Sequence, residues 1–204
     1  MSHSPSEFGP LTYIPRCYGY SEKGSVLEVY EPHSELPQIL IMGAIHGDES
    51  LSTVLLSECL RSIQDHELKS SVILAANPDG VVAGTRCNSR GVDLNRNYPT
   101  DNWSPDPVYY RNRPGTPQNI ALSPGDVPGS ESETKALIKL ILEIKPSLIV
   151  SIHGFLGCMD DPDASSIAKD IAQRSGLELV PDVGYATPGS FGSWCKEQAI
   201  PIIT

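Results

Sequence analysis

Short runs of apolar residues recur along the chain, separated by polar, glycine-rich or proline-rich segments. Short apolar runs bounded by turn residues are typical of buried strands, whereas strict alternation indicates a half-exposed strand. The pattern predicts strands at residues 26–30, 38–45, 72–76, 148–152 and 177–180, with a last one beginning at 200–203. The first of these alternates, and the next three have the continuous apolar character of buried strands.

Apolar residues at helical spacing lie between these runs. They predict helices at residues 51–63, 131–144, 164–174 and 189–198. Residues 1–24 are expected to wrap the surface as an irregular segment, and Asn77-Pro78-Asp79-Gly80 predicts a turn. Residues 81–130 have little periodicity and many Pro, Gly, Asn and Asp, so we expect a long loop there, either functional or disordered.

Strands that alternate with helices along 204 residues predict a single α/β domain spanning residues 1–204. The expected architecture is a three-layer α/β/α sandwich around a mixed, mostly parallel central sheet. Because the apolar run at 200–203 stops in mid-strand, we expect this domain to be cut short at its C-terminus.

Composition narrows the possible partners. The formal net charge of −10 argues against a nucleic acid or an anionic membrane as the main partner. Arg86, Arg90 and Arg96 nevertheless gather in mid-chain, which favours a small anionic ligand, although a solvated loop with surface ion pairs would look similar. The N-terminus lacks a signal-peptide pattern, no segment has the length and apolarity of a membrane span, and the five cysteines are scattered. These features predict a cytoplasmic protein with reduced thiols, and they indicate no particular oligomeric state.

Two of the predicted strands end on a histidine. His46 and Glu49 follow the strand at 38–45, and His153 follows the strand at 148–152. If these strands are neighbours in a parallel sheet, the three side chains converge at its carboxyl edge, where α/β proteins usually bind ligands. Two histidines and a glutamate form a catalytic zinc set that leaves one position open. The alternative for residues 46–49 is a polar turn with a helix-capping acid.

The motifs occur in a characteristic order. His-x-x-Glu at 46–49 is followed by Asn-Pro-Asp-Gly at 77–80, by Gly-Val-Asp-Leu-Asn-Arg-Asn-Tyr-Pro at 91–99 and by Ser-Ile-His at 151–153. This set resembles the zinc carboxypeptidase family, with its metallocarboxypeptidase A-like fold. Within that family, further segments such as Cys-Met-Asp-Asp-Pro at 158–162 resemble the bacterial murein peptide amidases. The resemblance implies a cytoplasmic zinc-dependent hydrolase that cleaves the γ-D-glutamyl–meso-diaminopimelate amide of murein tripeptide in cell-wall recycling.

The resemblance also implies roles for residues around the metal. His46, Glu49 and His153 match the ligands of one Zn²⁺ per chain. Asp93 matches the carboxylate that orients a ligand imidazole, with a turn-capping Asp as the alternative. Arg86 matches the arginine that polarises the scissile carbonyl, a role that suits a guanidinium because its charge persists at any working pH; Arg90 is the nearby alternative.

Other matches concern the substrate. Asn95 and Arg96 match the pair that clamps the terminal carboxylate of a small anionic peptide, although Arg96 in a structural ion pair would also fit. Tyr185 matches a mobile tyrosine that closes over bound peptide, or else it is a packed loop residue. Glycine at position 192 suggests room for a long polar side chain. Asp160 and Asp161 follow the strand that ends at His153; we expect them in a solvated turn, and the alternative is that they face the substrate's amino group.

The general base of the family is a glutamate on the strand that begins at 200–203, and we expect it about two residues beyond Thr204. Glu197 lies in the preceding predicted helix and is out of register for this role. The alternatives to a murein peptide amidase are therefore a general metallocarboxypeptidase, a deacylase of N-acyl amino acids, and a non-catalytic module that binds zinc and peptide.

Overall fold

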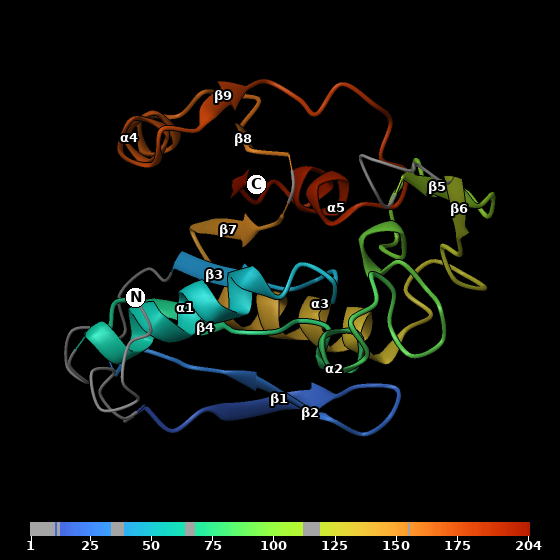
Figure 1. The fold of residues 1–204 in the computed structure, drawn as a ribbon, viewed down its shortest axis with the longest axis horizontal. Coiled ribbons are helices and arrows are strands. Elements are labelled where there is room, and N and C mark those ends of the chain that lie inside the picture. Colours follow the sequence, from blue (N-terminus) through green and yellow to red (C-terminus); the bar gives the residue numbers. More distant parts are fainter. Residues whose placement is uncertain (1–10, 12, 34–38, 64–67, 112–118, 155) are drawn as a thin grey trace.

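The structure is a computed structural model, and it describes residues 11, 13–33, 39–63, 68–111, 119–154 and 156–204. Figure 1 labels its elements. The strands are β1 (Arg16–Tyr20), β2 (Val26–Val29), β3 (Ile39–Gly43), β4 (Ser70–Ile73), β5 (Val108–Arg111), β6 (Asn119–Leu122), β7 (Leu148–Ile152), β8 (Cys158–Asp160), β9 (Glu178–Val180) and β10 (Ile202–Ile203). The helices are α1 (Leu51–Ser62), α2 (Pro78–Ala83), α3 (Ser132–Ile144), α4 (Ser166–Ser175) and α5 (Phe191–Glu197), with a 3-10 turn, η2, at Leu94–Arg96.

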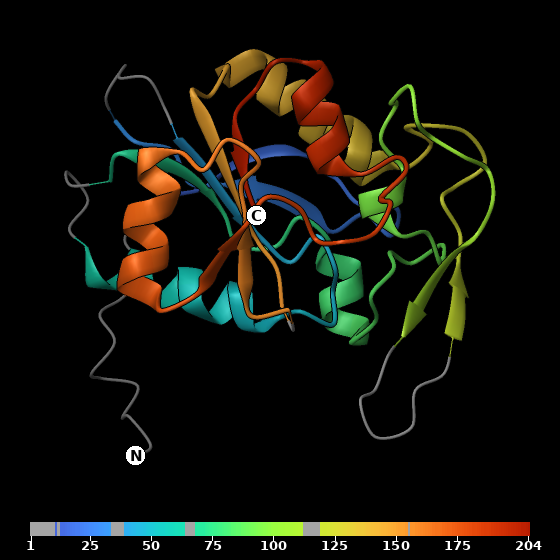
Figure 2. The ribbon, with the colours of Figure 1, turned by 90° about the horizontal axis from the view of Figure 1, so that it is seen from above.

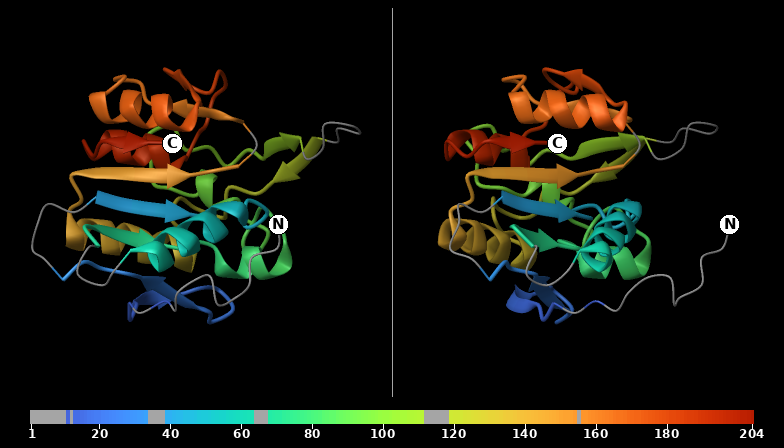
Figure 3. Two further views of the ribbon diagram at one scale, coloured as in Figure 1. Left: turned by 60° about the vertical axis from the view of Figure 1, so that its left-hand side comes forward. Right: turned by 90° about the vertical axis from the view of Figure 1, so that its left-hand side faces the viewer.

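The central sheet is parallel and has the strand order β10-β7-β3-β4. Figure 3 shows β7, β3 and β4 running in one direction, so their carboxyl ends meet at the same edge. The β1–β2 hairpin joins this sheet in the antiparallel sense, because Tyr30 and Val72 exchange backbone hydrogen bonds of 2.9 and 2.8 Å. The predicted mixed, mostly parallel sheet is confirmed.

Helices cover both faces of the sheet. Side chains alternate along a strand, so Leu40 and Met42 of β3 pack in the core with α3 and α5, while Ile41 packs on the other face with α1. The neighbouring α4 covers Ile39 on that same face. Figure 2 shows α3 and α5 on one side of the strands and α1 and α4 on the other. This arrangement is the expected three-layer α/β/α sandwich.

The prediction of an irregular surface segment at 1–24 is wrong for residues 16–20, which form β1; residues 1–10 and 12 lie outside the described residues. β1 pairs with β2 and lies against α3. A Cβ at Gly19 would stand only 2.6 Å from the Cβ of Ala136, so the glycine allows the strand to approach the helix closely. Short strands with mixed polarity carry too little periodic signal to be recognised alone.

The expected turn at 77–80 is instead the start of α2. Asn77 caps this helix by accepting a 3.0 Å hydrogen bond from the Gly80 N–H, and Pro78 occupies the first helical position. Likewise, the expected loop at 81–130 contains η2 and an antiparallel β5–β6 hairpin, which extends beside the sandwich in Figure 2. Residues that favour turns are frequent both at 77–80 and at 81–130. The same residue types also cap helices, so they do not by themselves distinguish a turn from the start of a helix.

The remaining predicted elements are present with ends shifted by a few residues, apart from residue 38, which lies outside the described residues. Besides β1, β5 and β6, β8 at Cys158–Asp160 was not predicted; it pairs with β9. Consequently Asp160 and Asp161 do not lie in a solvated turn. Asp161 is buried and its carboxylate accepts hydrogen bonds from the N–H (3.0 Å) and hydroxyl (2.6 Å) of Ser165.

Candidate active site

His46, Glu49 and His153 converge because β3 and β7 are neighbours in the sheet. The Glu49 carboxylate lies 3.0 Å from His46 Nδ1 through one oxygen and 3.1 Å from His153 Nδ1 through the other. The two Nδ1 atoms are 3.2 Å apart. The predicted three-residue cluster required the two strands to be neighbours in the sheet, and β3 and β7 are neighbours.

Glycine shapes the turn that carries the first two of these residues. A Cβ at Gly47 would collide with the backbone of Gly80 at the start of α2. The Gly47 N–H also donates to the Arg86 carbonyl at 3.3 Å. The His-Gly-Asp-Glu sequence thus allows the turn after β3 to pack directly on α2, which brings Arg86 next to Glu49.

Asp93 and Arg86 surround this cluster. The buried Asp93 lies 3.3 Å from His46 Nε2 and accepts a 3.1 Å hydrogen bond from Arg86 Nε, while Arg86 Nη1 donates to Glu49 at 3.3 Å. Burial would lower the pKa of Arg86, but the Asp93 and Glu49 carboxylates outweigh it and raise that pKa. Asp93 contacts the imidazole nitrogen of His46 that faces away from Glu49, as the predicted orienting role requires.

The cluster fits a zinc ion. Its three ligand groups lie within 4.8 Å of one another, and ligands at about 2.0–2.1 Å from a tetrahedral zinc are roughly 3.3 Å apart. Burial lowers the pKa of His153 and so favours its neutral, metal-binding form. Burial alone would raise the pKa of Glu49, but hydrogen bonds from His153 and His46 hold it well below its usual range. The lowered pKa values therefore favour an ionised Glu49 and a neutral His153, the forms in which carboxylate and imidazole bind a metal.

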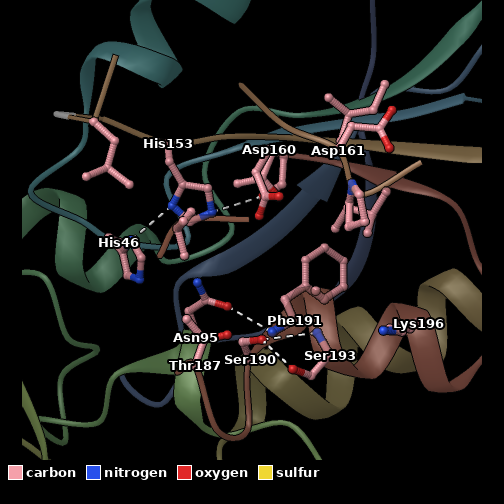
Figure 4. A pocket seen from close by; sticks show the side chains of 18 of the residues that line it. His46, Asn95, His153, Asp160, Asp161, Thr187, Ser190, Phe191, Ser193 and Lys196 are labelled. Atoms are coloured by element: carbon pink, nitrogen blue, oxygen red, sulfur yellow. Dashed lines mark hydrogen bonds between the residues drawn. The ribbon is translucent and has the colours of Figure 1, made fainter. Parts of the chain in front are cut away.

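Asn95 and Arg96 lie on the opposite wall of the same cleft. Asn95 Oδ1 accepts a 2.8 Å hydrogen bond from the Phe191 N–H at the start of α5, and Figure 4 shows the side-chain amide below the two histidines. Arg96 is buried and its Nε has no hydrogen-bond partner among the described residues. Burial lowers the pKa of Arg96. A buried guanidinium without a carboxylate partner in the described chain favours binding of an anion.

All eight predicted site residues line one cleft of about 1130 Å³. Tyr185 is half exposed at the cleft wall, with 57% of its surface accessible, so it is not a packed loop residue. Glu197 does not line the cleft and instead accepts a 2.9 Å hydrogen bond from the Asp101 N–H. Arg90 forms a 2.9 Å ion pair with Asp126 and does not line the cleft. Arg86 is therefore the arginine beside Glu49.

Several cleft residues were not recognised as site residues from the sequence. Ser151 Oγ lies 3.3 Å from His153 Nε2, and the Gly154 N–H donates to Glu49 at 3.0 Å. Lys196 also lines the cleft, and so does Asp160, for which a position facing the substrate was the alternative to the expected solvated turn. Ser151 could have been recognised as a site residue because it is a polar residue inside an apolar strand. The position of Asp160 in the cleft could not, because it is set by strand β8, which was not predicted.

Comparison with known proteins agrees with this geometry. A family model described as zinc carboxypeptidase matches residues 19–159, which include all three candidate zinc ligands. The chain therefore belongs to the zinc carboxypeptidase family. Family membership implies zinc, and the His46–Glu49–His153 cluster is its candidate site.

Two relatives are more specific. The chain is 43% identical to murein peptide amidase A of Escherichia coli K12 over 189 residues, covering 92% of this chain and 78% of the relative. A crystal structure of murein-tripeptide amidase from Escherichia coli O157 matches with a TM-score of 0.94 and 40% identity, covering 100% of this chain and 88% of that one. Both belong to the subgroup whose motifs the sequence resembles.

A more distant structure supports the fold alone. Carboxypeptidase A of Helicoverpa armigera matches with a TM-score of 0.69 at 18% identity, covering 98% of this chain and 60% of that one. In the described part of the chain, no helix is both long enough and apolar enough to span a membrane.

Proposed function

We propose that this protein is a zinc-dependent amidase that hydrolyses the γ-D-glutamyl–meso-diaminopimelate bond of murein tripeptide. The observation that carries the proposal is the convergence of His46, Glu49 and His153 in a cleft that is also lined by Arg96, a buried guanidinium that forms no ion pair with the described residues. Such a cleft provides a metal site and an anion anchor, which an amidase acting on a peptide with a free carboxylate requires. The similarity to murein peptide amidases supports this substrate class.

His46, Glu49 and His153 would hold one Zn²⁺ per chain. When bound by such a set, zinc acts as a Lewis acid and lowers the pKa of a bound water to about 7. Asp93 holds the His46 ring by contacting its Nε2 atom. Arg86, fixed between Asp93 and Glu49, places its positive charge at the cluster, where it stabilises negative charge that develops on the scissile carbonyl oxygen.

Asn95 and Arg96 position the substrate through its free carboxylate. The guanidinium offers several N–H donors in a fixed plane, and burial makes each charged hydrogen bond stronger than it would be in water. Tyr185 stands at the exposed rim and would close over the bound peptide. These contacts place the amide bond over the metal cluster, and orientation of this kind is a major part of catalysis.

We propose that the general base is a glutamate two positions beyond Thr204. Ile203 of β10 pairs with Val150 of β7 in parallel register. Continued in that register, the strand would place this position beside His153, at the same edge of the sheet as the metal ligands. There a carboxylate would take a proton from the attacking water and pass it to the leaving amine.

We further propose that the protein acts in the cytoplasm, in cell-wall recycling, on a small anionic peptide rather than on nucleic acid or membrane. The net charge of −10 supports the exclusion of polyanionic partners. Its thiols support a reducing compartment, because none of the five cysteines, all of which the structure describes, forms a disulfide.

The test is hydrolysis by the purified, zinc-loaded protein. It is incubated with L-alanyl-γ-D-glutamyl-meso-diaminopimelate, with an ordinary tripeptide ending in an α-linked apolar residue, and with an N-acetyl amino acid. Mass spectrometry of the products should detect free diaminopimelate from the first compound and little cleavage of the other two.

Different results would identify the alternatives. Cleavage of the ordinary tripeptide at a similar rate would indicate a general carboxypeptidase, and cleavage of the N-acetyl amino acid would indicate a deacylase. Tight binding of murein tripeptide without cleavage, in a protein shown to contain the glutamate after Thr204, would contradict the proposed reaction and indicate a binding module.

A further inference from the structure

A buried serine interrupts the apolar strand β7, two positions before His153. Ser151 is only 2% exposed and stands beside Met42 of β3 in the parallel register. Because side chains alternate along a strand, Ser151 lies on the face of the sheet where Ile149 and Met42 pack in the core. A hydroxyl in such a layer costs free energy unless it forms a hydrogen bond. The Ser151 hydroxyl therefore needs a partner close by.

The partner of this hydroxyl is the imidazole of His153. Ser151 Oγ lies 3.3 Å from His153 Nε2. Residues two positions apart on a strand point to the same face of the sheet, so the Ser-x-His spacing places the hydroxyl against one edge of the ring. Ser151 also lines the cleft together with His153. The serine is thus placed to act on the ring rather than on the apolar core.

The opposite edge of the same ring faces the other two proposed metal ligands. His153 Nδ1 lies 3.1 Å from the Glu49 carboxylate and 3.2 Å from His46 Nδ1. Figure 4 shows this edge of His153 directed toward His46. A neutral imidazole carries a proton on one nitrogen and a lone pair on the other, and a metal binds the lone pair. A His153 ring that binds zinc through Nδ1 therefore carries its proton on Nε2, the atom beside Ser151.

His46 has the same arrangement with a stronger partner. Its Nδ1 lies 3.0 Å from Glu49, and its Nε2 lies 3.3 Å from the buried Asp93 carboxylate. Each of the two histidines thus turns Nδ1 toward the cluster and Nε2 toward an oxygen atom of the chain. A carboxylate attracts an N–H group more strongly than a neutral hydroxyl does. The hydroxyl should therefore make the smaller contribution of the two.

The residue after His153 fixes the neighbouring ligand. The Gly154 N–H donates to Glu49 Oε2 at 3.0 Å, and a Cβ at Gly154 would stand only 3.2 Å from Glu49 Cγ. The carboxylate is therefore held by the backbone, whereas the His153 ring can still turn about its side-chain bonds. A contact at Nε2 limits that rotation. Ser151 and Gly154 together keep the ring and the carboxylate facing each other.

We infer that Ser151 is a positioning residue that holds the His153 imidazole with its proton on Nε2, so that Nδ1 is available to the metal. Ser151 Oγ accepts the hydrogen bond from Nε2–H and contacts neither metal nor substrate. The inference rests on the proposed zinc site at His46, Glu49 and His153. It follows that part of the zinc affinity is set by a residue that is not itself a ligand.

The test measures zinc affinity, so that it does not depend on hydrolysis. Competition with a chromophoric chelator gives the dissociation constant of zinc for the wild type and for Ser151→Ala, Ser151→Thr and Ser71→Ala. Ser151→Thr keeps the hydroxyl in a residue type that strands favour. Ser71→Ala is the matched control, because Ser71 is a fully buried serine on β4 of the same sheet and does not line the cleft.

Ser151→Ala should raise the dissociation constant of zinc by about three- to tenfold, the loss expected for one hydrogen bond with a neutral partner. Ser151→Thr should recover most of the affinity, and Ser71→Ala should leave it unchanged. In the cobalt-substituted protein, the visible absorption bands report the geometry of the ligands. These bands should shift in Ser151→Ala and return toward the wild-type spectrum in Ser151→Thr.

Urea unfolding of the zinc-free proteins separates positioning from packing. A loss of stability shared by Ser151→Ala and Ser71→Ala, with zinc affinity reduced only in Ser151→Ala, is the expected pattern. If Ser151→Thr does not fold, the comparison of these two alanine variants decides.

Unchanged zinc affinity in Ser151→Ala would overturn the positioning role, and so would an equal loss of affinity in Ser71→Ala. A folded Ser151→Thr variant that binds zinc as weakly as Ser151→Ala would also overturn it, because the hydroxyl is then not the cause. If the wild type binds zinc with the predicted dependence on Ser151 but releases no diaminopimelate from murein tripeptide, the proposed reaction fails while the positioning role stands. If it releases diaminopimelate but Ser151→Ala binds zinc like the wild type, the reverse holds.

Discussion

Two clusters in this protein each bring three potential metal-ligating side chains within 4.8 Å of one another. The first is His46, Glu49 and His153, and the second is Glu22, Glu131 and Glu133, at the start of α3. In the second cluster, the carboxylates accept hydrogen bonds from neighbouring residues of the chain. Asn88 Nδ2 donates to Glu131 at 2.8 Å and to Glu133 at 3.3 Å, and Ser132 donates to Glu22.

The first cluster differs in chemistry and in access. Imidazole nitrogens that can bind a metal face a carboxylate, and the group opens into the large cleft, whose lining includes no member of the second cluster. Proximity of acidic groups therefore does not define a site. A functional cluster needs ligand atoms of the right type and a path to solvent, whereas an acidic cluster with internal donors stabilises the fold.

The largest expected difference between the clusters is in zinc binding. Glu49→Gln should reduce bound zinc from about one ion per chain to background, and it should slow hydrolysis by roughly 10³-fold or more because the metal contributes several kcal/mol. Glu131→Gln in the second cluster is the matched control and should retain both. Elemental analysis and initial rates check this, and equal zinc loss in the two variants would contradict the assignment.

Arg96→Ala tests the anion anchor beside the first cluster. Loss of charged hydrogen bonds worth about 1.5–3 kcal/mol should lower kcat/KM for murein tripeptide by roughly 10–10²-fold, with zinc content unchanged. Arg96→Lys should recover only part of this, because lysine lacks the planar arrangement of donors. Arg174→Ala, which removes an exposed ion pair with Asp170, is the control. Loss of activity through loss of zinc would argue against the anchor.

Asp93→Asn tests whether the acid beside His46 acts through the metal. An amide is uncharged and orients the imidazole less strongly, so zinc affinity should fall about 10–100-fold. Competition with a chromophoric chelator measures this affinity. An unchanged affinity would assign Asp93 to the 3-10 turn alone, where it accepts a 2.9 Å hydrogen bond from the Asn95 N–H.

Asn88→Ala addresses the second cluster. It removes the amide donor to Glu131 and Glu133, and it should lower the free energy of unfolding by about 1–3 kcal/mol because buried carboxylates lose a partner. Urea unfolding measures the change. Zinc content should be the same as in the wild type, and a loss of zinc without a loss of stability would contradict the division between the clusters.

The smallest effect concerns pH. Burial raises the pKa of Glu133 above its usual value of about 4.3, despite hydrogen bonds from the Glu22 N–H and Asn88. A raised folded-state pKa favours folding below the unfolded pKa, and this benefit is lost as pH rises through the folded pKa. The stability of the wild type relative to Glu133→Gln should therefore decline as pH rises from about 4 toward neutrality. Unfolding curves at several pH values check this. A gain in the relative stability of the wild type as pH rises would contradict the prediction.

Much of the site was readable from the order of residues. Runs of apolar residues predicted β3 and β7, and a histidine follows each run. The sequence alone therefore indicated His46, Glu49 and His153 as a candidate metal site. The short elements were harder. β1 and β8 have too few periodic positions, and Asn77 looked like a turn residue although it caps α2, because turns and helix starts use the same side chains.

The sequence by itself determined where residues capable of binding a metal or an anion stand in the chain, and which segments are apolar enough to form buried strands. Only the tertiary structure decided that β7 lies beside β3, that Asp93 contacts the far nitrogen of His46, and that Asp160 and Lys196 line the same cleft. The physical reason is that side-chain alternation is a local property of a strand. The choice of neighbouring strand, by contrast, depends on packing between segments that are far apart in the chain, such as the 107 positions between His46 and His153.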